Sequence, residues 1–364
     1  IKSKINLPPF NNSAVDGYAI HKRDLYKAQK LLSTQRIAAG DKLPIDLKKG
    51  EVARIFTGAC MPANCKTVIM QENVTAKDKH ILINKIPTYG ENCRLAGEDI
   101  VKGSKVLSKG DKINATNINL IAAIGKQRVV VKKKLKIGYY VSGNELKKPS
   151  ERLHGSQINN SNHYSLHALL DHAYLESRYL GILRDSKKFI IDSILRNTNK
   201  FDVLITTGGA SVGEEDHLIQ TIQKLGKIFF WKAAIKPGRP LAVGKIKNTF
   251  MICLPGNPVS VHLLYGMIVK PFLEFLCGAP LIQPRGIKAT AMFSMKKKNQ
   301  RMEWLRVKIV KNSESLSVNK YYKQGSGMIS SMVFSDGILE IPENISYISR
   351  GDRFIFYSFK ELFN

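Results

Sequence analysis

The stretch FDVLITTGGASVG, residues 201–213, joins an apolar run to a glycine-rich turn. Its first seven residues predict a buried strand, and we expect a helix from about residue 215 to 225 behind the turn. A strand that leads through such a turn into a helix is typical of β-α-β units, whose parallel strands are covered by helices. The stretch therefore predicts an α/β domain around it.

The same alternation runs from about residue 135 to 277 and predicts a mostly parallel sheet with helices on both faces. Apolar residues at helical spacing, such as Leu166, Leu169 and Leu170, indicate helices, and short apolar runs indicate strands. We expect helices at 161–176, 186–197 and 257–278, and strands at 135–141, 177–183, 201–207, 227–235, 240–246 and 249–254.

Short β-rich runs, broken by Gly and Pro, flank this region on both sides. We therefore predict a multidomain α/β plus β protein, with a central parallel α/β domain between small β-rich domains. The predicted domains are 8–95 (β-rich), 1–7 with 96–132 (linking, with a helix at 115–125), 133–283 (α/β) and 284–364 (β-barrel-like).

Composition limits the classes of function. The five cysteines are scattered without a C-x-x-C pair, which argues against a disulfide framework or a zinc site and fits a cytoplasmic protein. We find no signal peptide and no run of about 20 apolar residues, so we expect no membrane partner. The formal net charge is +28, but the lysines are spread along the chain. We favour a lysine-rich surface; attraction of an anionic substrate is an alternative, and nucleic-acid binding is unlikely.

Five polar or Gly/Pro-rich loops each follow a predicted strand. The carboxyl ends of parallel strands share one edge of a sheet, and ligands bind along that edge. We therefore expect the five loops to meet in one crevice: SGNEL (142–146), RDS (184–186), TGGASVG (207–213), KPGRP (236–240) and LPGNP (254–258).

Two of these loops are suited to an anion. In LPGNP, Asn257 is a predicted helix N-cap and Pro258 the first helical residue, which leaves N–H groups at the positive end of a helix. The glycine turn could cradle a phosphate with Gly208, Gly209, Ser211 and Gly213. A plain capped helix and a plain tight turn are the alternatives. Lys232, Lys236 and Arg239 could add positive charge at the same place.

Three acids, Glu145, Asp185 and Asp216, are expected at the same edge. Carboxylates beside a phosphate cradle are the ligands of a hard divalent cation such as Mg²⁺. The alternative for each acid is a favourable interaction with a helix N-terminus. The turn also satisfies G-x-S-x-G around Ser211, but an acid and then a histidine in suitable positions do not follow, so a serine hydrolase is not favoured.

Eight motifs, in order from residue 7 to 278, resemble the molybdopterin molybdenumtransferase (MoeA) family, which is related to the E domain of gephyrin. QGSGMISSM (324–332) extends the resemblance into the last domain. The eight motifs are LPPFNNSAVDGYAI (7–20), RIFTGACMP (54–62), GEDI (97–100), VSGNEL (141–146), ILRD (182–185), TTGGASVGEEDH (206–217), WKAAIKPGRPLAVG (231–244) and LPGNPVSV (254–261).

The resemblance implies an enzyme that inserts molybdate into adenylylated molybdopterin, with magnesium-dependent release of AMP. It also implies a homodimer whose sites lie between the α/β domain of one subunit and the β domain of its partner. The implied partners are a molybdopterin adenylyltransferase and the molybdoenzyme apoproteins or their chaperones. A non-catalytic molybdopterin-binding or scaffold protein is the alternative.

The motifs also imply roles for individual residues. The implied metal ligands are Glu145, Asp185 and Asp216. The implied catalytic residues are these three with Lys232, Lys236, Asp16 and Thr57. The implied substrate-binding residues are Gly208, Gly209, Ser211, Gly213, Arg239, Pro255, Gly256, Asn257, Pro258, Asp99 and Ser326.

The chain departs from the family pattern in three places. Asn144 stands where an acid is usual, and Arg239 replaces a lysine with a different geometry. Family members carry a helical segment of the dimer-forming domain before LPPF, whereas only seven residues precede Pro8 here. A protein that lacked this segment would dimerise less readily, and a trimmed chain would not differ from its relatives.

Overall fold

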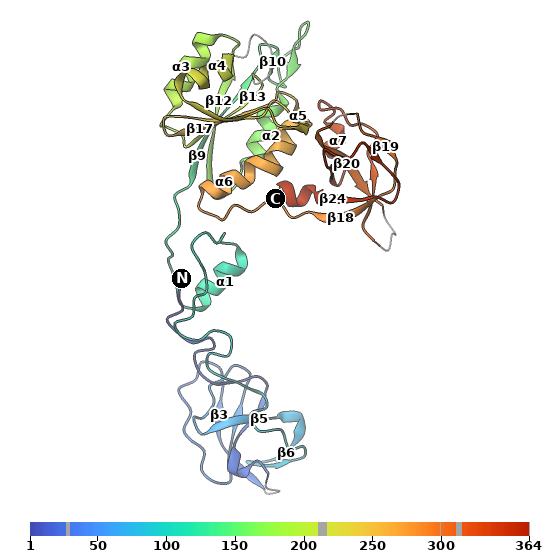
Figure 1. The fold of residues 1–364 in the computed structure, drawn as a ribbon. Coiled ribbons are helices and arrows are strands. Elements are labelled where there is room, and N and C mark those ends of the chain that lie inside the picture. Colours follow the sequence, from blue (N-terminus) through green and yellow to red (C-terminus); the bar gives the residue numbers. More distant parts are fainter. Residues whose placement is uncertain (27–29, 210–216, 299, 311–314, 364) are drawn as a thin grey trace. The chain divides into compact units, whose positions relative to one another are not determined.

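The computed structural model describes residues 1–26, 30–209, 217–298, 300–310 and 315–363. The chain divides into two compact units, Ile1–Val131 and Lys132–Asn364, which are described separately below. Figure 1 shows the α/β sheet and the carboxyl-terminal β domain of the second unit.

The central sheet of the second unit has six strands in the order β12-β9-β13-β17-β16-β14. Strands β12, β9, β13 and β17 run parallel, and β16 is antiparallel to both of its neighbours. Strand β14 therefore runs in the direction of β17. The bounds are β9 Leu135–Ser142, β12 Leu175–Leu183, β13 Val203–Thr207, β14 Lys227–Trp231, β16 Ala242–Ile246 and β17 Thr249–Leu254.

Helices cover both faces of this sheet, as the alternation predicts (Figure 1). On one face lie α2 (Ser161–Leu169), α5 (Pro258–Leu264) and α6 (Lys270–Leu276), with the π-helical turn η3 (Tyr265–Val269) between the last two. On the other face lie α3 (Lys187–Asn197) and α4 (His217–Leu225). The predicted α/β class is confirmed.

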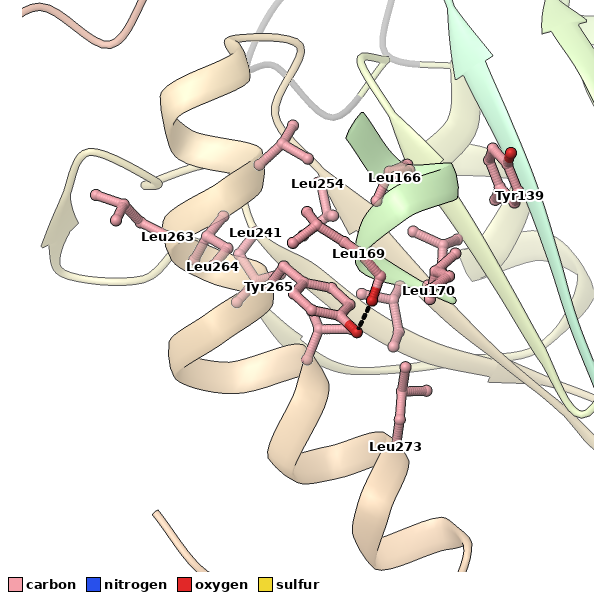
Figure 2. Close-up of a cluster of buried hydrophobic side chains, with 14 of the residues drawn as sticks. Tyr139, Leu166, Leu169, Leu170, Leu241, Leu254, Leu263, Leu264, Tyr265 and Leu273 are labelled. Atoms are coloured by element: carbon pink, nitrogen blue, oxygen red, sulfur yellow. Dashed lines mark hydrogen bonds between the residues drawn. The ribbon is translucent and has the colours of Figure 1, made fainter. Parts of the chain in front are cut away.

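A buried cluster fixes the first helical layer to the sheet. Figure 2 shows the Tyr265 hydroxyl, from η3, donating a hydrogen bond to the carbonyl oxygen of Leu169 at the end of α2. Both residues lie in the main hydrophobic core of the unit. Because a buried phenol needs a partner, this bond fixes the contact between the two elements.

Two predicted elements are wrong in extent. The helix expected at 161–176 ends at Leu169, because Leu175 and Glu176 pair with β9 instead. The strand expected at 227–235 stops at Trp231, and Lys232 takes a left-handed backbone conformation with φ of 70°. Ile235 and Lys236 then form the short strand β15, which pairs with β20 of the carboxyl-terminal domain.

The carboxyl-terminal domain is a closed ring of five strands, because β20 pairs with both β21 and β22. Trp304, Ile338 and Leu362 of this region pack into the main core of the α/β domain, so the two domains share a core. The bounds are β18 Ile287–Ala291, β20 Met302–Ile309, β21 Ser317–Lys320, β22 Gly337–Ile341, β24 Arg353–Ser358, α7 Ser330–Val333 and α8 Phe359–Phe363, with β19 (Met295–Lys296) and β23 (Tyr347–Ile348) as a two-stranded addition.

The amino-terminal unit contains a separate six-stranded sheet in the order β5-β2-β4-β3-β7-β6. Its helix α1 (Ala115–Ala123) begins with a capping box between Asn114 and Asn117. The bounds are β1 Asn12–Ser13, β2 Gly17–His21, β3 Leu31–Ile37, β4 Glu51–Ile55, β5 Cys65–Met70, β6 Val74–Lys77, β7 His80–Ile83 and β8 Cys93–Arg94.

One described helical stretch, Pro258–Leu276, is long and apolar enough to cross a membrane by length and composition alone. Within the structure 61% of it is buried, and its apolar side chains belong to the core shown in Figure 2. Its hydrophobicity is therefore accounted for by packing against the sheet.

Candidate functional site

The predicted convergence of loops at one edge of the sheet is confirmed by the strand register. Ser142 at the end of β9 lies beside Leu183 of β12, and Thr207 of β13 lies beside Leu254 of β17. Strand β14 ends at the same edge, because Trp231 pairs with Ala242, which in turn pairs with Cys253. The loops that follow these strands therefore share one edge.

The glycine turn packs closely on the end of β9. Gly208 and Gly209 have φ of 83° and 69°, values that favour glycine. A Cβ atom on Gly208 would lie 2.7 Å from the carbonyl oxygen of Ser142, so a side chain is excluded there. The Gly208 N–H donates to the Leu254 carbonyl at 3.0 Å, which ties this turn to the LPGNP loop.

Two of the three predicted metal ligands lie on adjacent loops of this edge. The Ser142 hydroxyl, which the sequence did not single out, donates to Asp185 Oδ1 at 3.5 Å. Asn144 Oδ1 accepts from the Asp185 N–H at 3.4 Å, so this asparagine orients the Asp185 turn. Glu145 and Asp185 are both exposed. Across the described ranges, no three His, Cys, Asp or Glu side chains form a group able to hold a metal ion.

Three predicted site residues, Ser211, Gly213 and Asp216, lie outside the described residues. The metal triad is therefore represented by Glu145 and Asp185 alone. Their carboxylates and the Ser142 hydroxyl are hard oxygen donors, which suit Mg²⁺ better than softer metals.

A cavity of about 250 Å³ lies where the α/β loops meet the carboxyl-terminal domain. Its lining includes the predicted residues Lys236, Arg239, Pro255, Asn257 and Ser326. Among its described lining residues, four side chains are cationic and one, Glu303, is a carboxylate, so the formal charge of the lining is +3. The remaining lining residues are Ile235, Pro237, Gly238, Pro240, Ser260, Arg301, Arg306, Gln324 and Gly325.

Two contacts hold the walls of this cavity together. Strand β15 pairs with β20, and the Lys236 ammonium lies 2.7 Å from Glu303 Oε1. The Lys236 side chain is 39% exposed and that of Glu303 only 8%. On the opposite wall, the Val259 N–H in the first turn of α5 donates to the Ser326 carbonyl at 3.2 Å.

The start of α5 differs in detail from the prediction. Asn257 is the N-cap and Pro258 the first helical residue, as predicted, but the Asn257 side chain makes no capping hydrogen bond. The Val259 N–H is occupied by Ser326 and is not available to an anion. The prediction of free N–H groups is therefore wrong at this position, because the carboxyl-terminal domain supplies an acceptor that was not visible locally.

Arg306 of β20 was missed by the sequence reasoning. It is 1% exposed, and its guanidinium donates to the Ser331 hydroxyl and to the carbonyls of Trp304 and Gly325. Burial lowers the pKa of Arg306 to about 10, and the charge of Glu303 opposes that shift. The available signal was the pair Glu303 and Arg306 within an otherwise apolar strand, since charged residues are seldom buried without a partner.

Lys232 lies at the end of β14, beside the cavity loop. Its N–H donates to the Leu241 carbonyl at 3.0 Å, and its ammonium lies 4.1 Å from the centre of the Trp231 ring. A cation over an aromatic face is stabilised by the ring quadrupole. The exposed Lys232 charge is thus held at the edge where the phosphate cradle lies.

In the amino-terminal unit the structure brings Asp16 and Thr57 together. Both the N–H and the hydroxyl of Thr57 donate to Asp16 Oδ1 at 2.8 Å. These bonds, with a smaller contribution from the charge of Arg54, lower the pKa of Asp16. The pair arises because Asp16 precedes β2, Thr57 follows β4, and Gly17 pairs with Ile55. Asp99 is exposed in the same unit and donates its N–H to the Leu7 carbonyl.

Comparison with known proteins matches three family models along the chain. These are the MoeA N-terminal region (domain I and II) over residues 1–125, the "Probable molybdopterin binding domain" over 139–274, and the MoeA C-terminal region (domain IV) over 288–359. The chain is 33% identical over 365 residues to the molybdopterin molybdenumtransferase of Haemophilus influenzae, which spans 100% of this chain and 90% of that protein.

The chain belongs to the MoeA family. The molybdopterin molybdenumtransferase of Staphylococcus aureus strain MSSA476 is 30% identical over 94% of this chain and 83% of its own length. The crystal structure of the molybdopterin biosynthesis MoeA protein from Pyrococcus horikoshii OT3 superposes with a TM-score of 0.82, at 28% identity over 98% of this chain and 90% of that chain. The predicted family, its multidomain fold and its class as a transferase of molybdenum cofactor biosynthesis are confirmed.

Proposed function

We propose that this MoeA protein inserts molybdate into adenylylated molybdopterin in the cytoplasm, with magnesium-dependent release of AMP. The observation that carries the proposal is the cavity lined by Lys236, Arg239, Arg301 and Arg306, whose formal charge of +3 suits a small dianion. Molybdate is a tetrahedral dianion, and cations held rigidly in a partly closed site attract it more strongly than the same cations in water.

The second half of the substrate fits the neighbouring loops. Gly208 and Gly209 leave room for a close approach of the pterin phosphate to the backbone, and Lys232 supplies a cation at the same edge. Lys232 and Lys236 would offset the negative charge that develops on the phosphoanhydride in the transition state. Because the cavity loop runs between these two lysines, molybdate and phosphate would be held on adjoining parts of one loop.

Glu145 and Asp185 would hold the magnesium ion, with the Ser142 hydroxyl orienting Asp185. When bound, Mg²⁺ supplies charge stabilisation for the phosphate oxygens. Asp16 and Thr57 would act on the substrate from the partner subunit of a homodimer. The lowered pKa of Asp16 supports a carboxylate that stays ionised and can accept a hydrogen bond from the substrate.

The test is AMP release from adenylylated molybdopterin, followed with and without molybdate at a fixed magnesium concentration. The proposal expects AMP release that depends on molybdate and leaves molybdenum bound to the pterin. Tight pterin binding without AMP release above background would contradict it and favour a non-catalytic carrier.

A further inference from the structure

The cavity contains a feature that an anion site does not need for attraction: a buried carboxylate. Glu303 is 6% exposed and is the one acid among the described residues that line the cavity. A carboxylate in such a position repels any anion that enters. Its presence therefore requires a physical reason beyond binding.

We propose that Glu303 limits the affinity of the cavity for molybdate, so that the dianion can leave the cavity for the pterin. This proposal rests on the function proposed above. Glu303 touches Lys236 at 2.7 Å, so the cation nearest the cavity mouth is shared between a permanent internal anion and the incoming one.

Catalysis by a transfer site needs a bound state that is not too stable. Interactions that stabilise the bound substrate as much as the transition state do not raise the rate at saturating substrate, and stronger ones in the ground state lower it. Four cations around one dianion would hold it tightly, because none of that charge would be compensated. One carboxylate among the cations reduces this attraction without removing any ligand.

The geometry favours this role over a purely structural one. Strand β15 is joined to β20 by backbone pairing, and the Met302 N–H donates to the Ala234 carbonyl at 3.0 Å. The loop that carries Lys236 is therefore held in place by main-chain bonds. The carboxylate is not needed to fix that contact, so its main consequence is electrostatic.

The decisive variant is Glu303→Gln, which keeps the shape and a hydrogen-bond acceptor for Lys236 but removes the charge. Removing one unit charge from about 6 Å away changes the affinity for a dianion by roughly tenfold, even at the dielectric constant of water. We expect molybdate to bind about tenfold more tightly to this variant in calorimetric titration of the full chain. We also expect a several-fold slower AMP release at saturating molybdate.

Glu340→Gln is the matched control. Glu340 pairs directly with Trp304 across β20 and β22 and accepts a hydrogen bond from its indole at 3.0 Å. Successive residues of a strand face opposite sides, so Glu340 lies on the face away from Glu303. The control changes the net charge of the same domain equally, and we expect its molybdate affinity to stay within about twofold of the wild type.

A second variant keeps the test decisive if Glu303→Gln folds poorly. The pair Lys236→Gln with Glu303→Gln restores the formal charge of the lining to +3 and leaves neither charge unpartnered. If Glu303 limits affinity, the double variant binds molybdate about tenfold more tightly than Lys236→Gln alone.

The outcomes separate the two proposals. Wild-type protein that does not bind molybdate in the titration overturns the molybdate assignment of the cavity, and the role of Glu303 with it. Wild-type protein that binds molybdate, together with a Glu303→Gln variant that binds equally or more weakly, overturns only the role of Glu303. Loss of the gain at high salt is expected, because exposed parts of the field are screened.

Discussion

The cavity of the second unit and the Asp16–Thr57 pair of the first unit use charge in different ways. The cavity gathers cations around a partly closed space and compensates them with one buried acid. The pair places one carboxylate at an exposed turn, held by two hydrogen bonds from a single threonine. A dianion can be bound by the first arrangement but not by the second. The difference indicates that the cavity controls binding and that Asp16 controls turnover.

The largest expected effect comes from Lys236→Gln. The substitution removes a ligand of the dianion and leaves Glu303 without its ion-pair partner. We expect molybdate affinity and molybdate-dependent AMP release to fall by roughly a hundredfold or more. Calorimetric titration and AMP release measure the two effects. Unchanged molybdate affinity in a folded variant would place the anion elsewhere.

Asp16→Asn sharpens the comparison from the other side. The turn keeps its hydrogen bonds but loses the carboxylate charge, so we expect AMP release to fall by roughly tenfold to a hundredfold. Molybdate affinity should stay at the wild-type level, because the cavity is built within the second unit alone. A parallel loss of molybdate affinity would contradict the division of roles.

Mixing the two variants tests whether the regions meet between subunits. In a homodimer with shared sites, one intact site combines the cavity of the Asp16→Asn chain with Asp16 of the other chain. Random pairing would restore about a quarter of the wild-type activity. Activity no higher than the sum of the separate variants would assign both regions to the same chain.

Asp185→Asn addresses the edge of the sheet next to the cavity. The change keeps the hydrogen bond from Ser142 but removes a charged ligand. We expect the magnesium concentration for half-maximal AMP release to rise by roughly tenfold, since Mg²⁺ favours carboxylate oxygens. A magnesium titration at saturating molybdate measures this, and an unchanged requirement would remove Asp185 from the metal site.

The smallest expected effect is that of Thr57→Val. The hydroxyl is lost but the backbone donor to Asp16, which is the larger cause of the lowered pKa, remains. We expect the pKa of Asp16 to rise part of the way to its ordinary value, as read from an NMR titration of its carboxyl carbon. An unchanged pKa would mean that the Thr57 hydroxyl does not act on Asp16.

The direction of the linked pH effect follows from that shift. Because folding lowers the pKa of Asp16, the stabilisation is present above the pKa of the unfolded chain and is lost as the pH falls through the lowered folded value. Thr57→Val should therefore narrow this acid window, as measured by thermal unfolding at acid pH. Equal acid sensitivity of both proteins would contradict the assignment.

The sequence predicted the features that depend on local pattern. Apolar runs and helical spacing located β9, β13 and α3, and strand-end loops located the edge of the sheet where Gly208 and Asp185 lie. The family motifs identified Asp16 and Thr57, although nothing in their own spacing indicates that they touch.

What was missed depends on contacts between distant segments. The break after Trp231 follows from pairing of Ile235 and Lys236 with β20, which no local pattern reveals. Glu303 and Arg306 are far along the chain from Lys236 and become cavity residues only because the two domains share a core. The occupied Val259 N–H has the same cause, since its acceptor is a carbonyl of the carboxyl-terminal domain.

Anomalous diffraction at the molybdenum absorption edge, from crystals of the full chain grown with molybdate, tests the central claim most directly. The account predicts one strong peak in the cavity, within hydrogen-bonding distance of Lys236 and of a cavity arginine. A peak elsewhere on the chain, with none in the cavity, would contradict it.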